Sequence, residues 1–238
     1  YKLFGKNAEL LIDHAWGWEP CTVADIKAYK PSTNSISTGQ VLACPYTADK
    51  ARIVVQEMID GLSLELVEKQ LVTDQLVLTV GYDIENLTRP EIQKVYKGPV
   101  TTDRYGRRVP KHAHGTWNLP RATSSSSELL EAIAALYDKI VNPALLIRRM
   151  SLSACHVVNE KMAKEREQKE TFEQLDLFTD YAKKEAKEKE EQKKRERERR
   201  MQEALLTIKK KYGKNAVLRG MNFEEGATAK ERNGQIGG

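Results

Sequence analysis

Two stretches of helical hydrophobic periodicity, each set between segments of strand-like composition, constrain the fold of this 238-residue chain more than any other feature. Thr47 is a candidate cap for the first helix, and Ser125 with Glu128 forms a capping box for the second. The apolar residues recur every three or four positions, and they are Ala51, Val55, Met58, Leu62 and Leu66 in the first helix and Leu129, Ile133, Leu136 and Ile140 in the second. We therefore predict two amphipathic helices, each with one buried face.

Four segments beside these helices have the composition of β-strands, with β-branched, small or alternating apolar residues. They are Ser35–Cys44, Gln75–Tyr82, His114–Leu119 and Leu145–Val158. Pro45 is expected to end the first strand. The order of elements is then β-α-β-β-α-β, which predicts an α+β fold of the ferredoxin-like type, with two helices on one face of a four-stranded sheet.

The segments outside this pattern are more polar. Tyr1–Trp18 has the spacing of a helix, and Glu19–Asn34 reads as a tether. Ile84–His112, between the second and third strands, is rich in turn-forming residues and is expected to form an extended excursion such as a hairpin. The hydrophobic pattern stops after Asn159, which predicts a charged helical or flexible tail with a Gly-rich end.

The charge is concentrated in one part of this tail. Lys183–Arg200 holds ten Lys and Arg against six Glu, a local charge of +4 out of a total of +5. The rest of the chain is therefore almost neutral, with 29 basic and 28 acidic residues (39−10 and 34−6). A solvated helix or a disordered arm is the ordinary interpretation of such a run.

Several classes of protein are excluded or disfavoured. No apolar run approaches the roughly 18 residues of a membrane span. The three cysteines, Cys21, Cys44 and Cys155, are scattered and form no CxxC pair. We therefore expect neither a disulfide scaffold nor a cysteine zinc site, and we expect the protein to be located in the reducing cytoplasm. His112 and His114 have no Asp, Glu or Cys nearby to complete a metal site. We find no catalytic motif and expect no catalytic or metal-binding residue.

The uncovered face of the predicted sheet is the first candidate site. Arg149, Ser151 and Ser153 alternate to one side of the last strand, and Ser35 and Ser37 share a face of the first. Hydroxyl and guanidinium groups are suited to phosphate oxygens, although an ordinary solvated sheet face explains this pattern equally well. A cationic cluster in the excursion favours binding of a polyanion, and it consists of Arg104, Arg107, Arg108 and Lys111.

The second candidate is a short apolar cluster in the polar tail. It has the sequence QLDLF, and its residues are Gln174, Leu175, Asp176, Leu177 and Phe178. Exposed leucine and phenylalanine side chains gain nothing unless they dock on another surface. The cluster is thus either a peptide that binds a partner or a turn that packs back on its own domain.

Several segments together resemble one known family. The segments FGKNAELLIDHAWGWE, NSISTGQVL, QLVLTVGY, LLIRRMSLSACHV and QLDLF, in this order over about Tyr1–Phe178, are similar to the C-terminal part of bacterial Y-family translesion DNA polymerases of the UmuC/DinB type. The resemblance implies that 1–33 is the end of the thumb and a tether, and that 34–159 is the DNA-binding little finger. It also implies that 160–182 is a clamp-binding tail, followed at 183–238 by the charged helix and the Gly-rich end.

The resemblance also implies partners and site residues. The first and last strands of the family contact the DNA backbone, which corresponds to Ser35, Ser37, Arg148 and Arg149. QLDLF corresponds to the sliding-clamp motif, so primer-template or damaged DNA and the bacterial clamp are the expected partners. The catalytic palm, with its Mg²⁺-binding carboxylates, is expected before Tyr1, and this chain alone is expected to be inactive. Asn34 departs from the family, which often has a basic residue there.

Two other classes of protein fit parts of the pattern. An RRM-like RNA-binding module has the same order of elements, but it carries aromatic residues on its central strands, and the last strand here has none. A structural protein that assembles through the charged helix 182–212 is the other alternative. That helix has no sustained heptad stripe through Lys183–Arg200, which argues against a coiled coil.

Overall fold

The computed structural model describes residues 2, 4–5, 7–29, 34–103, 106–163, 165 and 181–235, with the side chains of 7 and 181–188 left out. The chain forms two compact units, Tyr1–Asn34 and Ser35–Gly238. In the first unit, helix α1 (Asn7–Ala15) is shorter than the predicted helix Tyr1–Trp18, because the chain turns at Gly17 with a φ of +73°. The predicted tether contains a second short helix, α2 (Val23–Ala28), which a capping box of Thr22 and Asp25 begins.

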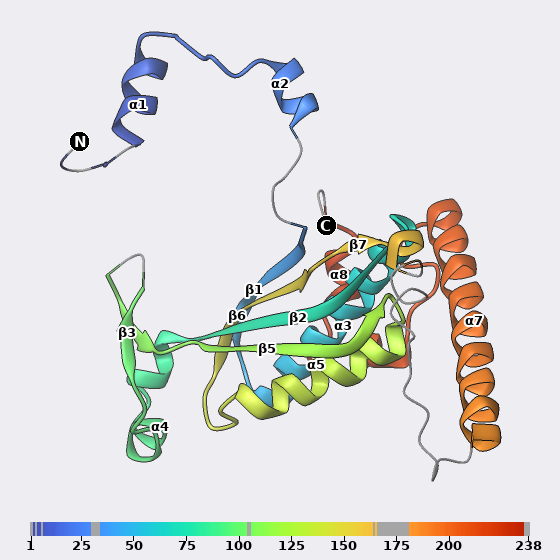
Figure 1. The fold of residues 1–238 in the computed structure, drawn as a ribbon. Helices are drawn as coiled ribbons and strands as arrows, with labels where there is room; N and C mark the ends of the chain where they lie inside the picture. The colour runs from blue at the N-terminus through green and yellow to red at the C-terminus, as the bar shows by residue number, and fades with distance from the viewer. Residues whose placement is uncertain are drawn as a thin grey trace. The chain divides into compact units, whose positions relative to one another are not determined.

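The second unit is built on an antiparallel sheet with the predicted β-α-β-β-α-β order, and the α+β class is confirmed (Figure 1). The sheet order is β1-β6-β2-β5. Each βαβ unit is therefore split by a strand of the other: β6 lies between β1 and β2, and β2 lies between β5 and β6. The elements that form this core are β1 (Ile36–Tyr46), α3 (Ala48–Glu68), β2 (Leu71–Tyr82), β5 (Ala113–Thr123), α5 (Ser126–Ile140) and β6 (Ile147–Cys155).

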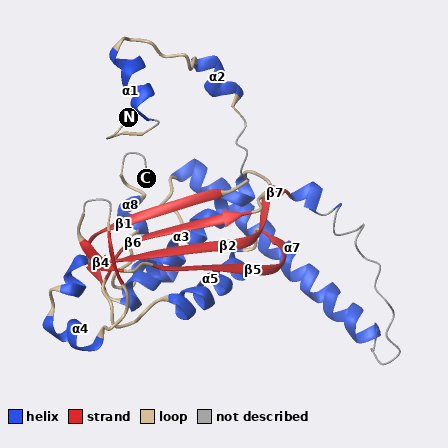
Figure 2. Cartoon of the chain, turned by 60° about the vertical axis from the view of Figure 1, so that its left-hand side comes forward, coloured by secondary structure: helices blue, strands red, loops and turns tan. Residues whose placement is uncertain are grey.

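Helices α3 and α5 cover one face of the sheet, as the two apolar stripes predicted (Figure 2). Every residue named in those stripes is fully buried except Ile140, which packs against the core. The sheet contributes the alternate residues of its strands to this core, among them Leu76, Leu78, Val80, Met150 and Leu152. The other face of the sheet is left uncovered by these helices.

Two capping predictions need correction. Thr47 stands at the N-cap of α3, but its side chain makes no capping hydrogen bond. Ser125 does cap α5, since its Oγ accepts from the backbone N–H of Glu128 at 3.3 Å. The Glu128 carboxylate does not complete a capping box, because it pairs with Arg121 instead.

Several strand boundaries also differ from the predictions: β5 is longer than His114–Leu119, and the predicted strand Leu145–Val158 is divided into β6 and the short β7. Strand β1 continues through Pro45 to Tyr46, because β1 is an edge strand whose pairing with β6 becomes irregular after Val41. A proline is tolerated where no ladder hydrogen bond is needed from its nitrogen. Strand β2 begins at Leu71 rather than Gln75, and its first residues pair with β7 (Val158–Asn159).

The excursion between β2 and β5 contains a hairpin, as predicted. The chain passes through η1 (Ile84–Leu87) and α4 (Pro90–Val95) before strands β3 (Val100–Thr102) and β4 (Arg108–Pro110) pair antiparallel. Figure 1 shows this hairpin projecting from one end of the sheet, with helix α7 (Tyr181–Tyr212) at the opposite end.

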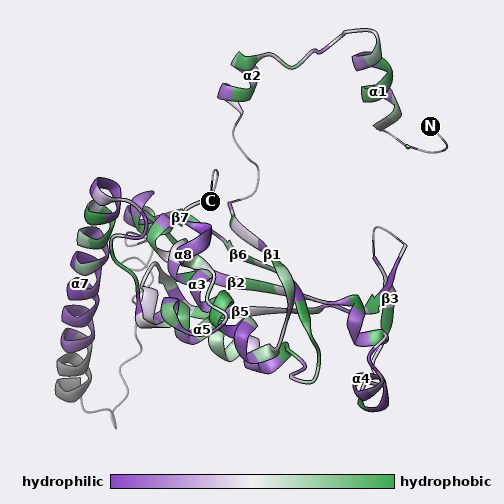
Figure 3. Cartoon of the chain, turned by 180° about the vertical axis from the view of Figure 1, so that it is seen from behind, coloured by the Kyte–Doolittle hydropathy of each residue, from purple (hydrophilic) through white to green (hydrophobic). Residues whose placement is uncertain are grey.

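Helix α7 is hydrophilic over most of its described surface (Figure 3), yet it is attached to the domain by polar contacts. The Glu198 carboxylate accepts hydrogen bonds from Ser127 N at 2.8 Å and Ser125 Oγ at 2.7 Å, at the start of α5. Gln202 is buried, and its Nε2 donates to Ser124 O at 3.0 Å and to the Ser126 hydroxyl at 2.9 Å. The tail therefore includes a docked helix.

The segment after α7 returns to α3 through η2 (Gly220–Phe223) and α8 (Ala229–Arg232). Its contacts converge on the buried carboxylate of Glu57, which accepts from Asn222 Nδ2 at 2.8 Å, Thr228 N at 2.8 Å and Ala229 N at 3.0 Å. A buried charge is tolerated where hydrogen bonds replace its water. This segment is therefore an integral part of the second unit.

Candidate nucleic-acid interface

The face of the sheet that α3 and α5 leave uncovered, here called the open face, is lined by small and polar side chains. The register of the strands sets these residues in rows across the sheet: Ser37 pairs with Ser153, Gly39 with Ser151, and Val41 with Arg149. Strands β2 and β5 extend the rows with Thr79 and His114, Val77 and Thr116, and Gln75 and Asn118.

Hydrogen bonds between neighbouring strands order these polar groups. The hydroxyls of Ser37 and Ser153 are 2.7 Å apart. Thr79 Oγ1 lies 2.9 Å from His114 Nδ1, and Gln75 Nε2 donates to Asn118 Oδ1 at 2.9 Å. Ser35, exposed and immediately before β1, extends the strand on which Ser37 lies. The open face thus offers hydroxyl, amide and imidazole groups in fixed positions.

Arg149 is the cation of this face. It is exposed, and its side chain lies across β2 directly over Gly81, to which it is paired in the sheet. Among the residues that the structure describes, no carboxylate forms an ion pair with Arg149. Its guanidinium is therefore available to an external anion.

Arg148, the next residue, has a different environment. The β2–β6 register shifts between Gly81 and Tyr82, because Tyr82 pairs with Ile147 and Gly81 with Arg149, which leaves Arg148 as an extra residue in β6. Its Nε lies 3.8 Å from Oδ2 of the buried Asp83, whose other oxygen caps η1. The predicted pair of adjacent arginines is thus divided into one exposed cation and one cation beside a carboxylate.

The cations of the excursion are divided in the same way. Arg107 donates to Asp103 through its backbone N–H and its guanidinium, at distances from 2.7 to 3.0 Å, and so stabilises the hairpin turn. Arg108 and Lys111 are exposed, and neither pairs with a carboxylate in the described part of the chain. Arg104 lies outside the described residues.

The fold brings the two predicted cationic groups to one end of the sheet. Arg148 and Arg149 follow Ile147 at the start of β6, beside the end of β2, and the hairpin that carries Arg108 leaves the sheet there (Figure 1). Arg108 and Arg148 are 40 residues apart in the sequence, and the sheet topology brings their segments to the same end of the sheet. The result is a polar face with its exposed cations at one end.

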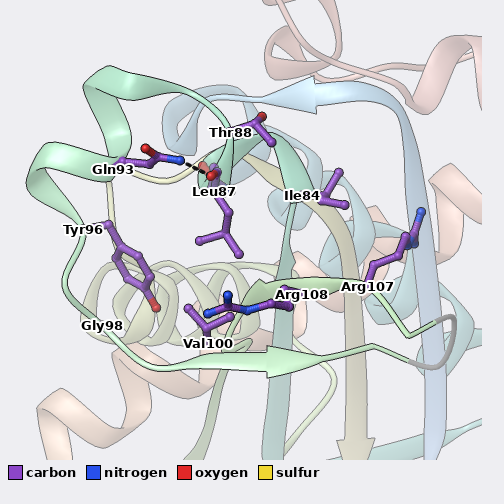
Figure 4. Close-up of a pocket in the computed structure, with 10 residues that line it drawn as sticks. Ile84, Leu87, Thr88, Gln93, Tyr96, Gly98, Val100, Arg107 and Arg108 are labelled. Carbon is purple, nitrogen blue, oxygen red and sulfur yellow. Dashed lines mark hydrogen bonds between the residues drawn. The ribbon is translucent and has the colours of Figure 1, made fainter.

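A pocket of about 580 Å³ lies within the excursion (Figure 4). Arg108 is directed into it and Arg107 away from its centre, and Gln93 donates to the Leu87 carbonyl at its rim. Tyr96 covers Gly98 and donates to the Pro99 carbonyl at 2.8 Å, which fixes the wall of the pocket. These contacts hold the hairpin in a defined shape.

Sequence reasoning did not single out the central residues of the open face. Thr79, His114, Thr116, Gln75 and Asn118 complete the rows that Ser37, Ser151 and Ser153 began. The signal was available, because the exposed residues of β5 alternate strictly from His114 to Pro120.

Other features bear on the alternatives. The open-face residues named above include no Phe, Tyr or Trp, so the large aromatic residues that stack bases on the central strands of an RRM are not among them. Within the described residues, no group of three or more His, Cys, Asp or Glu side chains is placed to hold a metal ion. None of the described helices is long and apolar enough to cross a membrane. The five residues Gln174–Phe178 lie outside the described part of the chain.

The chain matches the impB/mucB/samB family C-terminal domain over residues 33–177, and it therefore belongs to this family. It contains the C-terminal, little-finger part of a Y-family DNA polymerase, as the sequence motifs predicted. Among solved structures it is similar to a chain described as "Complex of beta-clamp processivity factor and little finger domain of PolIV". That likeness has 9% identity and a TM-score of 0.34, and covers 61% of this chain and 100% of the other. No curated protein matches the chain.

Proposed function

We propose that the second unit binds primer-template DNA through the open face and the cations at its end. The observation that carries this proposal is that Arg149, which has no described carboxylate partner, lies on the same face as a row of ordered hydroxyls. Arg108 and Lys111, also without a described carboxylate partner, lie in the excursion that leaves the sheet at the Arg149 end. Such groups bind phosphate oxygens, whose charge and geometry repeat along any duplex.

The proposed contacts are independent of base sequence. On the open face, Gln75 and Asn118 are hydrogen-bonded to each other and the hydroxyls are short, which favours contacts to the backbone over contacts to base edges. Contacts to phosphate position a protein on DNA without reading bases. A polymerase that accepts damaged templates requires a grip of this kind, because a lesion changes the base and leaves the backbone in place. Error-prone translesion synthesis in DNA damage tolerance, including the SOS response, is thus the proposed context.

The test is a salt series of binding measurements. The 238-residue chain should bind two duplexes of unrelated sequence with equal affinity, and log Kd should rise linearly with log salt concentration. A single-stranded RNA of the same length serves as the comparison for the RRM-like alternative. Binding that is insensitive to salt, preference for one duplex sequence, or preference for the RNA would each contradict the proposal.

We also propose that Gln174–Phe178 docks on the bacterial sliding clamp, a proposal that rests on the motif alone. Leu177 and Phe178 would be the apolar anchors in a clamp pocket. Tethering to a clamp that encircles DNA raises the effective concentration of a weak DNA-binding domain at the primer end. The peptide Glu173–Thr179 should bind the clamp.

A matched pair of variants in the whole chain tests the motif. The double substitution L177A/F178A should abolish clamp binding in calorimetry, and F172A, an aromatic truncation just outside the motif, should leave it unchanged. Equal affinity of the double variant and the unmodified chain would exclude the motif as the clamp ligand.

The remaining parts of the proposal concern the chemistry and its location. Nucleotidyl transfer and its Mg²⁺ are assigned to a palm domain that these 238 residues do not contain, so this chain alone should not extend a primer in the presence of Mg²⁺ and nucleotides. Because the proposed ligand is chromosomal DNA, the proposed location is the cytoplasm. Primer extension by the purified chain would overturn the assignment.

A further inference from the structure

Gly81 has an unusual environment for a glycine in a strand interior. A Cβ atom built on Gly81 would lie 2.6 Å from Arg149 Cγ, 2.7 Å from its Nε and 3.2 Å from its Cδ. These are its three nearest neighbours, and all belong to one side chain. Gly81 is therefore covered by the aliphatic stem and the guanidinium nitrogen of Arg149.

The other glycines of the sheet are different. A Cβ at Gly115 would meet Ile140 and Leu136 of α5 at 2.8 and 2.9 Å, respectively, so Gly115 accommodates core packing. A Cβ at Gly39, on the open face of β1, would have Met150 O as its nearest neighbour at an ordinary 3.6 Å. Gly81 alone among these three leaves room for a functional side chain.

Backbone conformation does not explain Gly81 either. Its φ lies outside the left-handed region, so an alanine can adopt the same backbone. Glycine in a strand interior is destabilising by roughly 0.5–1 kcal/mol relative to alanine. Folding alone therefore favours a larger residue at this position.

We propose that Gly81 is a positioning residue for DNA binding: it leaves a flat channel across β2 in which the Arg149 side chain lies, directed from β6 toward β5. The register places this channel beside the start of β5, since Val80, the preceding residue, pairs with Ala113. Lys111 lies two residues before Ala113. The channel thus directs Arg149 across β2 toward the start of β5, the strand that follows the excursion.

This inference rests on the proposed function and deepens it. A long side chain that is already held in its bound orientation loses less rotational freedom when it meets a phosphate. Arg149 contributes charge in any conformation, but only the channel fixes where that charge is. Filling the channel should therefore weaken binding without removing a charge.

The experiment is a double-mutant cycle on the 238-residue chain, with duplex DNA affinity measured by fluorescence anisotropy. G81A should weaken binding about threefold to tenfold, the range expected when one long side chain must be immobilised on binding. G61A, a control on α3 where an added Cβ would meet nothing within 4 Å, should bind as the unmodified chain does. R149A should weaken binding and lower the salt slope by about 1. In the R149A background, G81A should have no further effect, and this non-additivity distinguishes positioning from a general structural defect.

The outcomes separate the inference from the function on which it rests. If R149A weakens binding and G81A does not, the positioning role is wrong and the interface stands. If G81A weakens binding equally with and without Arg149, Gly81 acts through the fold and the inference is overturned. If neither substitution changes the affinity, the interface itself is wrong.

A measurement on the unmodified chain covers the case in which G81A fails to fold. The Nε–H group of Arg149 should be more ordered in NMR relaxation than that of Arg197, because Arg149 lies in a channel and Arg197 is exposed on α7. Equal order parameters below about 0.6, the range of flexible groups, would overturn the inference.

Discussion

The charged run of α7 and the cationic end of the sheet differ in how their cations are used. In α7, Arg199 pairs with Glu160 at 2.9 Å and with Glu203 at 3.0 Å, and Lys210 pairs with Glu68 at 2.8 Å. At the end of the sheet, the exposed Arg149, Arg108 and Lys111 have no described carboxylate partner. Some cations of α7, the segment with the highest charge density, are thus used in ion pairs within the domain.

The difference shows that the number of cations does not locate an anion-binding surface. A guanidinium that is already paired with a carboxylate must lose that partner before it can bind a phosphate. An exposed, unpaired guanidinium on a rigid strand has no such cost. The adjacent residues Arg148 and Arg149 show this difference. Arg148 is the extra residue in β6 and lies beside Asp83, whereas Arg149 is exposed.

The largest expected effect is at the sheet. The double charge reversal R108E/R149E should lower duplex DNA affinity roughly 10- to 100-fold or more, because a hydrogen bond to a charged group contributes about 1.5–3 kcal/mol. The loss should be the same for unrelated sequences, and the salt slope should fall by about 2. Anisotropy titrations measure both quantities. Unchanged affinity would show that the cationic end of the sheet does not bind DNA.

The next effect concerns the docking of α7. E198A removes the acceptor of the Ser127 N–H and of two serine hydroxyls, and should lower the free energy of unfolding by about 1–2 kcal/mol in urea titrations. E196A is the control, since its carboxylate lies 3.9 Å from exposed Arg200. DNA affinity should be the same in both variants. A stability equal to that of the control would show that the Glu198 contacts do not hold the helix.

A smaller effect is expected from the exposed cations of α7. K193E/R197E reverses as many charges as the sheet variant, but should change DNA affinity less than about twofold, since exposed charges farther than about 10 Å from the ligand are screened. The comparison is made at the same salt concentration. A loss of DNA affinity as large as that of R108E/R149E would place α7 in the interface and show that the two regions do not differ in DNA binding.

The smallest effect is a change in pH dependence. Burial raises the pKa of Asp60 above its ordinary 3.8, because the loss of water around the carboxylate outweighs the opposing effect of Arg219, whose Nε lies 2.7 Å from Asp60 Oδ1, and of Lys209. The folded protein then retains a proton on Asp60 over a pH range in which the unfolded chain has lost it, so the contribution of Asp60 to stability decreases as pH rises through that range. The free energy of unfolding of the unmodified chain, minus that of D60N, should therefore fall from pH 4 upward. A flat difference would contradict this.

The hydrophobic pattern was sufficient for the core of the fold. The stripes of α3 and α5 and the alternation of β2 predicted the elements, their order and the helix-covered face, because burial of apolar side chains determines these features. The ends of the strands were less well predicted. Pro45 ended the predicted strand, but an edge strand with irregular pairing can continue through it, and edge position is a tertiary property.

The polar contacts of the structure could not be predicted from the sequence pattern. Glu198, Gln202 and Glu57 dock the tail through hydrogen bonds, which leave no periodic signal in a segment of mixed charge. The role proposed for Gly81 depends on the side chain of a residue on another strand, 68 positions along the chain. The candidate cations were found in the sequence, but only the sheet register and the ion pairs separate the exposed ones from the paired ones.

The buried carboxylate of Glu57 has a consequence for the order in which the domain is made. Its partners Asn222, Thr228 and Ala229 follow it by 165, 171 and 172 residues. On the ribosome, β6 emerges long before these residues, so the sheet and its two covering helices can assemble while Glu57 is still hydrated. The closing segment adds the contacts of longest sequence separation, which form late because their loop closure must be completed first. The C-terminal segment is therefore the last part of the domain to fold, although it rests on the first of its helices.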